Sequence, residues 1–230
     1  MLDNISIVAF DLDDTLWPCL PTINHAENTL YRWLSDHYPR VTEQCDPDQM
    51  ISRRREFTAK DPRYSVDLTG MRYDFLRHLG EQHGYDGEEL SHRGFEVFFD
   101  ARQQVTFYDD VLPCLERLGQ RFRLGAISNG NASIEHVGLG HLIEHAISAS
   151  ELKVAKPDPI IYQTLADHFD VSLEQIVYVG DHPHYDVVGP IEAGCRAVWI
   201  NREDLEWPED LDQPEHQITD LHQLEALLKG

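Results

Sequence analysis

The sequence predicts an α/β protein: a doubly wound parallel sheet into which an all-helical domain is inserted. Two observations support this fold class. Short β-branched runs alternate with helical patterns through the C-terminal half, as in sheets whose parallel strands are joined by helices. A long stretch after the first strand contains helical patterns and no convincing strand. With 230 residues, 41% of them hydrophobic, the chain is long enough to bury a core of its own.

Five apolar runs are expected to form the buried strands of the sheet. The first is Ile5–Leu12 (ISIVAFDL), which ends in acidic residues. The other four are Phe122–Ser128, His145–Ser148, Ile176–Gly180 and Arg196–Ile200. The helices expected to accompany them are Val111–Leu118, Ile160–Phe169, Val187–Glu192 and a terminal amphipathic helix at Leu221–Leu228.

Residues 18–105 are expected to form the inserted helical domain, and residues 1–17 and 106–230 the α/β core. The insertion is punctuated by prolines and by a Gly-containing break, which separate its helical patterns. Its expected helices are Ala26–His37, Gln49–Ala59, Leu68–Gln82 and Gly87–Gln103. Apolar side chains at helical spacing are interpreted as the core of this domain, namely Leu30, Trp33, Leu34, Phe95, Phe98 and Phe99.

Composition argues against several classes of partner. The formal net charge of −22 would repel the phosphates of nucleic acids and anionic lipid surfaces, so neither is an expected partner. No apolar run approaches the roughly 20 residues of a membrane-spanning helix, and no signal peptide is recognisable, so a cytoplasmic protein is expected. The cysteines are scattered without metal-ligand spacing and are interpreted as reduced thiols: Cys19, Cys45, Cys114 and Cys195.

The strongest chemical signal is the acidic loop after the first strand, Asp11-Leu12-Asp13-Asp14-Thr15. Open α/β sheets bind their ligands at the carboxyl ends of their strands, which is where this loop is expected. By itself the pattern is equally compatible with carboxylates that cap the next turn, because Asp and Thr are common loop residues.

Three later features strengthen the functional interpretation. Ser128 and Asn129 precede Gly130 after the second predicted strand, where a hydroxyl and backbone N–H groups can hold phosphate oxygens. Lys156 precedes the helix expected from Ile160, and Asp181 and Asp186 follow another apolar strand. Each has a structural alternative, a surface lysine or a loop-capping carboxylate, but their order along the chain is hard to obtain by chance.

These residues resemble the four motifs of the haloacid dehalogenase (HAD) superfamily. Asp11-x-Asp13-x-Thr15 resembles the first motif, Ser128 the second, Lys156 the third, and Gly180-Asp181 with Asp186 the fourth. The resemblance covers residues 1–17 and 106–230, implies a Rossmann-like core, and makes the helical insertion similar to the mobile cap of many members. One departure is Tyr185, where many relatives have Asn before the last Asp. The carboxylate spacing survives, but a hydrogen bond from that amide is in doubt.

The resemblance implies a phosphoryl-transfer mechanism that uses Mg²⁺. Asp11 is the expected nucleophile, and Asp13 the acid and base. Lys156 and Ser128 are expected to assist catalysis and to bind the phosphate together with Asn129 and Thr15. The expected metal ligands are Asp11, the backbone carbonyl of Asp13, and Asp181. Asp186 is expected in a supporting role that orients Lys156 or a metal-bound water.

A small phosphorylated metabolite is the expected substrate, hydrolysed by a phosphomonoesterase. The phrases Asp11 to Trp17 and Ile127 to Asn131, joined to a helical cap, look similar to the bacterial flavin mononucleotide (FMN) phosphatase branch. That similarity favours FMN or the phosphorylated ribitylaminouracil intermediate of riboflavin synthesis. Two alternatives stay open: a phosphomutase acting on a sugar phosphate, and a noncatalytic phosphate-binding protein. Retention of Asp13 favours phosphoryl chemistry over dehalogenation.

Overall fold

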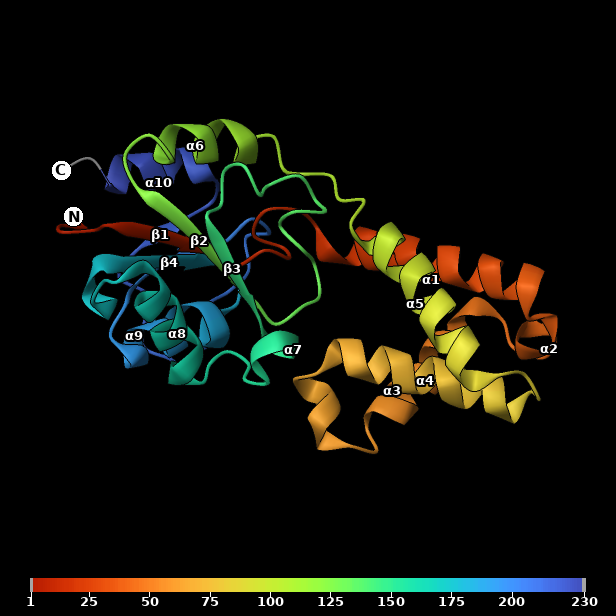
Figure 1. The fold of residues 1–230 in the computed structure, drawn as a ribbon. Helices are drawn as coiled ribbons and strands as arrows, with labels where there is room; N and C mark the ends of the chain where they lie inside the picture. Colours follow the sequence, from red (N-terminus) through yellow and green to blue (C-terminus); the bar gives the residue numbers. More distant parts are fainter. Residues whose placement is uncertain (1, 229–230) are drawn as a thin grey trace. The chain divides into compact units, whose positions relative to one another are not determined.

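The computed structural model describes residues 2–228, which fall into two compact units (Figure 1). One unit, called the sheet unit below, contains the residues up to Pro18 and those from Thr106 onward. The other, called the helical insert, is Cys19–Val105. The predicted fold class is confirmed, because the insert is helical and the sheet unit contains a parallel sheet with helices on both faces.

The sheet has six parallel strands in the order β3-β2-β1-β4-β5-β6. Their bounds are Ile7–Phe10 (β1), Arg123–Ser128 (β2), His145–Ser148 (β3), Ile176–Gly180 (β4), Arg196–Ile200 (β5) and Gln217–Ile218 (β6). After β1, the chain adds β2 and β3 on one side of it. The chain then crosses back to add β4, β5 and β6 on the other side. This reversal brings the carboxyl ends of β1, β2 and β4 together, as Phe10 is opposite both Ala126 and Val179. Such a switch point is where an open α/β sheet forms its binding crevice.

Helices cover the two faces of the sheet, with α6 and α10 on one side and α8 and α9 on the other (Figure 1). Side chains of α8, including Leu165 and Phe169, pack with Ile7 and Ile127 of the strands in one buried cluster. The helices of this unit are α6 (Val111–Leu118), α7 (Ala149–Leu152), α8 (Pro159–Phe169), η2 (Leu173–Gln175), η3 (Pro183–Val188), α9 (Gly189–Ala193) and α10 (Leu221–Leu227).

The helical insert has its own hydrophobic core. Its helices are α1 (Cys19–His37), α2 (Pro39–Thr42), α3 (Pro47–Thr58), η1 (Pro62–Ser65), α4 (Leu68–Gln82) and α5 (Gly87–Arg102). Four of them begin where an aspartate side chain accepts a hydrogen bond from a backbone N–H of the first turn: Asp46 for α3, Asp61 for η1, Asp67 for α4 and Asp86 for α5. The predicted core residues Leu30, Leu34, Phe95 and Phe98 are buried, while Trp33 and Phe99 are partly buried against them.

The elements that differ from the sequence-based expectations include α1, the helix expected at Val187–Glu192 and β6. Helix α1 begins at Cys19, seven residues before the predicted start, because Pro21 lies in the first turn, where its missing N–H is tolerated. The helix expected at Val187–Glu192 is divided between the π-helix η3 and α9. Strand β6 was not predicted, since a run of two residues is too short to show alternation.

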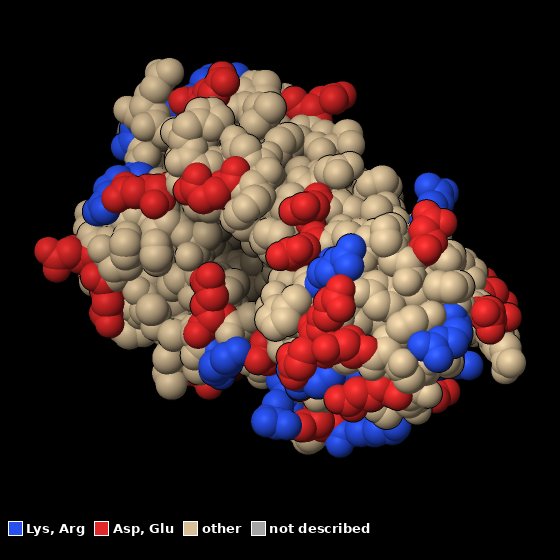
Figure 2. All heavy atoms as spheres, turned by 45° about the vertical axis from the view of Figure 1, so that its right-hand side comes forward, with Lys and Arg blue, Asp and Glu red and all other residues tan. Residues whose placement is uncertain are grey.

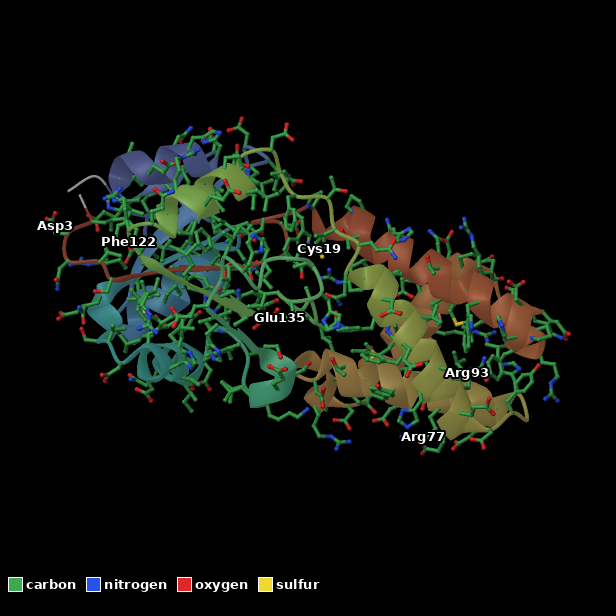
Figure 3. All side chains as sticks on the ribbon, turned by 45° about the horizontal axis from the view of Figure 1, so that its top comes forward. Asp3, Cys19, Arg77, Arg93, Phe122 and Glu135 are labelled. Atoms are coloured by element: carbon green, nitrogen blue, oxygen red, sulfur yellow. The ribbon has the colours of Figure 1, made fainter. Side chains whose placement is uncertain are left out.

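Within residues 2–228, no helix combines the length and the apolar character needed to cross a membrane. On the face drawn in Figure 2, acidic and basic side chains lie next to one another mainly in the lower right part of the view, and residues of other kinds cover most of the rest. Figure 3 labels Cys19, the first residue of α1.

Candidate active site

The first acidic loop is held at the end of β1, a strand that is buried at all of its positions. Asp11 follows this strand and is itself buried, and its N–H donates to the carbonyl oxygen of Val179 in β4 over 2.9 Å. The next residues close into a tight turn in which Asp14 has a positive φ of 60°. The indole Nε1 of Trp17 donates to Asp13 Oδ1 over 2.9 Å, and the Asp14 N–H donates to the Trp17 carbonyl over 2.7 Å. Trp17 therefore braces the loop and orients Asp13.

Lys156 lies at the centre of the site with its ammonium group buried. Its Nζ donates to Asp11 Oδ1 over 2.5 Å, to Asp186 Oδ1 over 2.7 Å and to the hydroxyl of Tyr178 over 3.0 Å. An ammonium group has three protons, so these three bonds use all of them. Burial by itself lowers the pKa of Lys156, but the adjacent carboxylates of Asp11 and Asp186 outweigh it and raise that pKa. Lys156 is therefore a permanent cation beside Asp11.

Asn129 holds the backbone of Lys156 from both sides. Its side-chain Oδ1 accepts from the Lys156 N–H over 2.8 Å, and its Nδ2 donates to the Lys156 carbonyl over 3.1 Å. Ser128 is buried at the end of β2, and its Oγ accepts from the Gly130 N–H over 2.9 Å. Ser128 is thus placed at the same edge of the sheet as Asp11, as expected. The amide side chain of Asn129, in contrast, is engaged with Lys156.

Asp181 follows β4 and is tied down by two neighbours. The hydroxyl of Thr15 donates to Asp181 Oδ1 over 3.2 Å, and the indole of Trp199 donates to the Asp181 carbonyl over 2.7 Å. Burial raises the pKa of the Asp181 carboxyl to about 7, with further contributions from the nearby carboxylates of Asp186 and Asp14. Asp181 therefore lies in a cluster of carboxylates whose negative charge is only partly neutralised by Lys156.

Asp186 is buried on η3 and fits against the end of β4. Its Oδ2 accepts from the His182 N–H over 2.9 Å, while its Oδ1 accepts a hydrogen bond from Lys156 Nζ. A Cβ atom at Gly180 would meet the Asp186 carboxyl carbon at 2.4 Å, so only glycine leaves room for this carboxylate. The sequence expectation that Asp186 orients Lys156 agrees with these contacts.

The carboxylates of Asp11, Asp181 and Asp186 form a group that could hold a cation, since one oxygen of each lies within 4.8 Å of the others. The pKa of Asp11 is raised well above its ordinary value. Burial is the largest cause. Lys156 opposes the increase, while the nearby carboxylates of Asp186 and Asp181 add to it. A hard divalent cation such as Mg²⁺ takes oxygen ligands and would relieve this repulsion, so the donor set fits it. Asp13 contributes no carboxylate to this group of described residues. Its expected role, through the backbone carbonyl, stays a prediction.

Tyr185 occupies the position where the sequence departs from the HAD pattern. Its ring stacks on that of His182, with centroids 4.1 Å apart, and its carbonyl oxygen accepts from the hydroxyl of Tyr162 over 2.6 Å. The imidazole Nδ1 of His182 also accepts from the N–H groups of His184 and Tyr185. The turn that carries Asp186 is thus held by ring stacking and backbone bonds without an asparagine amide.

Tyr178 and Arg202 belong to the site and were not predicted from the sequence. Tyr178 is buried in β4, donates to the Ile127 carbonyl over 2.8 Å and accepts from Lys156. A tyrosine in an otherwise aliphatic strand, IVYVG, is the signal that could have identified it. Arg202 donates to the Thr15 carbonyl over 2.9 Å and pairs with Asp110, but nothing near it in the sequence indicates that contact.

The family model described as haloacid dehalogenase-like hydrolase matches residues 5–194. The chain belongs to this family. It is a HAD-like hydrolase whose sheet, helices and helical insert match those of solved HAD structures. The predicted superfamily and enzyme class are therefore confirmed.

Two solved structures are similar to this HAD-like chain over nearly its whole length. A structure titled 2-haloacid dehalogenase, from Pseudomonas syringae pv. Tomato DC3000, is 36% identical with a TM-score of 0.90, over 97% of this chain and 98% of that one. A HAD phosphatase from Thermococcus onnurineus is 23% identical with a TM-score of 0.69, over 98% and 99% of the two chains. The second similarity concerns the fold alone.

Among curated proteins, the HAD-like chain is 29% identical to 5-amino-6-(5-phospho-D-ribitylamino)uracil phosphatase YigB of Escherichia coli K12, over 99% of this chain and 98% of that protein. It is also 29% identical to a glyceraldehyde 3-phosphate phosphatase of Methanopyrus kandleri, over 93% of each.

Proposed function

We propose that the protein is a Mg²⁺-dependent phosphomonoesterase that hydrolyses a small phosphorylated metabolite through an aspartyl-phosphate on Asp11. The observation that carries the proposal is the convergence of the Asp11, Asp181 and Asp186 carboxylates beside the ammonium group of Lys156. A carboxylate nucleophile needs positive charge around it before an anionic phosphate can approach. The full-length similarity to YigB and to the Methanopyrus phosphatase supports the same reaction class.

In the proposed reaction, a carboxylate oxygen of Asp11 attacks phosphorus and the ester oxygen of the substrate leaves. Asp13 gives its proton to that leaving oxygen, so the product is a neutral alcohol. Asp13 then accepts a proton from water, which attacks the phosphorus of the aspartyl-phosphate and regenerates Asp11 with release of inorganic phosphate. The hydrogen bond from Trp17 to Asp13 Oδ1 keeps this carboxyl oriented through both steps.

The remaining residues of the set hold the phosphoryl group and its charge. Mg²⁺, held by Asp11, the Asp13 carbonyl and Asp181, would neutralise negative charge on the phosphoryl oxygens. Lys156 supplies a second positive charge, and the hydroxyl of Ser128 and the backbone N–H of Asn129 donate to phosphoryl oxygens. We assign Thr15 to positioning, because its hydroxyl bonds Asp181.

We assign residues 1–17 and 106–230 to a catalytic core and residues 18–105 to a cap that contributes substrate specificity. Similarity to YigB makes the phosphorylated ribitylaminouracil intermediate of riboflavin synthesis the first substrate to test, and FMN the second. Both carry a phosphate ester on a ribityl chain.

Dehalogenation of a small haloacid is the second candidate, since it is favoured by the 36% identity to a structure titled 2-haloacid dehalogenase. Asp11 would then attack the carbon that carries the halogen, displace the halide and form an ester with the substrate. A halide leaves without a proton, so the acid role of Asp13 would have no purpose in that reaction.

The deciding experiment measures inorganic phosphate release from the two riboflavin-pathway phosphates and a panel of sugar phosphates, with and without Mg²⁺. Chloride release from chloropropionate is measured in parallel, and Asp11→Asn is the control for both. Mg²⁺-dependent phosphate release that is absent in Asp11→Asn is the expected result. Chloride release without phosphate release would replace the proposal with dehalogenation. Phosphate moved to another position of a sugar, detected by product analysis, would indicate a mutase.

A further inference from the structure

The helical insert contains a surface pocket of about 470 Å³ between α3 and α4. This volume falls within the usual range of small-molecule sites, roughly 300–1,000 Å³. Every residue that lines it belongs to the insert, so it is distinct from the carboxylate cluster around Asp11. The lining residues are Arg53, Glu56, Phe57, Lys60, Phe75, His78, Leu79, Gln82 and His83.

The apolar part of the pocket is built from Phe57, Phe75 and Leu79. Phe75 and Leu79 are buried in the core of the insert, and Phe57 is partly buried against it. The ring of Phe57 lies 5.6 Å from that of Phe75 and stacks on Tyr64 with centroids 5.5 Å apart. Phe57 also lies beside the ring of His78, with centroids 5.5 Å apart, so three neighbouring rings hold it in place. The aromatic lining is therefore fixed, which suits a flat apolar group.

The polar part of the pocket carries cations without partners. Within residues 2–228, neither Arg53 nor Lys60 forms an ion pair, and both are exposed. Arg63, Arg77 and Arg93 of the same insert are each paired with a carboxylate, and the last two are labelled in Figure 3.

One carboxylate, that of Glu56, lines the pocket against these two cations. The lining therefore has a net positive formal charge with both histidines neutral, in a chain whose net charge is −22. His78 and His83 add further nitrogen atoms that can donate to an anion. The formal charge of the lining is thus opposite in sign to the net charge of the whole protein.

We propose that this pocket binds a small planar aromatic anion as a ligand separate from the one that reacts at Asp11. The ring would lie against Phe57, and the anionic group would face Arg53 and Lys60. A hydrated inorganic ion would leave the aromatic surface unused, and a neutral aromatic compound would leave the two cations without a counter-charge. The binding does not depend on the proposed phosphatase activity, so it is measured in the absence of turnover.

The probe is anilinonaphthalene sulfonate, an aromatic anion that fluoresces when its ring leaves water. Titrated into the folded wild-type chain, it is expected to bind one site. The double variant Arg53→Glu with Lys60→Glu is expected to weaken its binding at least about tenfold, because two nearby attractions become repulsions. The control, Arg32→Glu with Arg55→Glu, changes the net charge equally on exposed residues outside the pocket and is expected to change the affinity less than about twofold.

Three outcomes would overturn the proposal. Equal weakening in both double variants would mean that the probe senses only overall charge, and no weakening in either would place the probe elsewhere. Displacement of the probe by inorganic phosphate with Mg²⁺ would show that it occupies the Asp11 site. Asp11→Asn gives the independent check, since it is expected to leave the affinity for the probe unchanged. Circular dichroism spectra identical to wild type establish that each variant is folded.

Discussion

The hydroxyl of Tyr178 lies 3.0 Å from the ammonium nitrogen of Lys156 and donates its own proton to the Ile127 carbonyl oxygen 2.8 Å away. Burial raises the pKa of Tyr178, so the hydroxyl keeps its proton. With that proton committed to Ile127, the oxygen can only accept from Lys156. Tyr178 is therefore a positioning residue that completes the three bonds of the ammonium group and aims it at Asp11 and Asp186.

Tyr178→Phe is expected to lower kcat for phosphate release by about tenfold to a hundredfold, because a hydrogen bond to a charged group contributes about 1.5–3 kcal/mol. KM should change little, since Tyr178 is fully buried and its hydroxyl bonds Lys156 and the Ile127 carbonyl. Steady-state kinetics with the best substrate of the panel tests this. The matched control is Tyr31→Phe, whose hydroxyl donates to the Cys45 carbonyl within the helical insert and bonds no residue of the site. Equal losses of kcat in both variants would argue for a general packing effect.

Asn129 is expected to act through the backbone of Lys156. Asn129→Ala removes both side-chain bonds and should lower kcat by about tenfold or more, since each bond contributes about 1 kcal/mol. Asn129→Asp keeps the acceptor for the Lys156 N–H, but it turns a carboxylate oxygen toward the Lys156 carbonyl oxygen and adds a negative charge beside the proposed phosphate site. Its loss should therefore be at least as large as that of Asn129→Ala. Kinetics on the two variants gives this order, and a smaller loss in Asn129→Asp than in Asn129→Ala would contradict it.

Mg²⁺ is expected to raise the melting temperature of the wild-type chain, because a ligand of the native state stabilises it in proportion to its occupancy. Asp181→Asn should abolish most of that increase, and in EDTA it should be at least as stable as wild type, since it removes one charge from a crowded carboxylate group. Differential scanning calorimetry with and without Mg²⁺ measures both. Asp158→Asn, at the exposed start of α8, is the charge-matched control. An undiminished Mg²⁺ effect in Asp181→Asn would place the cation elsewhere.

Glu27 is expected to contribute to the stability of the helical insert in a pH-dependent way. Burial by itself raises the pKa of Glu27, but the guanidinium groups of Arg72, at 2.9 Å, and Arg54, at 3.1 Å, outweigh it and lower that pKa. A carboxyl whose folded pKa is below its unfolded pKa stabilises the fold above the unfolded value and loses that contribution as the pH falls through the folded value. Glu27→Gln should therefore destabilise by about 3 kcal/mol near pH 7, where it leaves Arg72 buried without its partner.

Urea unfolding of wild type and Glu27→Gln at about pH 7 and about pH 3 tests this, and the difference between the two chains should shrink at the lower pH. Glu89→Gln is the control, because its pairing with Arg93 is exposed and such pairs contribute about 0–1 kcal/mol. A Glu27→Gln effect that is constant with pH would show that the ion pair is not its cause.

The sequence predicted which residues belong to the candidate site more completely than it predicted the contacts among them. Asp11, Ser128 and Asp181 each follow an apolar run, and parallel strands bring their carboxyl ends to one edge, so their proximity could be inferred from order alone. The full membership of the carboxylate group was harder to predict from the sequence. Asp186 joins the carboxylate group through the η3 turn, whose geometry depends on His182 and Tyr185 and has no periodic signature.

Local pattern therefore predicted five of the six strands of the described residues, the helical insertion, and the acidic, hydroxyl and basic residues that are expected to carry the chemistry, since these depend on neighbours along the chain. Only the tertiary structure decided that Tyr178 and Asn129 orient Lys156, that Arg202 supports Thr15, and that Arg53 and Lys60 share a pocket with Phe57. Each of these depends on the direction of a side chain across a sheet or between two helices. Such directions are fixed by packing between segments distant in sequence, and hydrophobic periodicity carries no information about them.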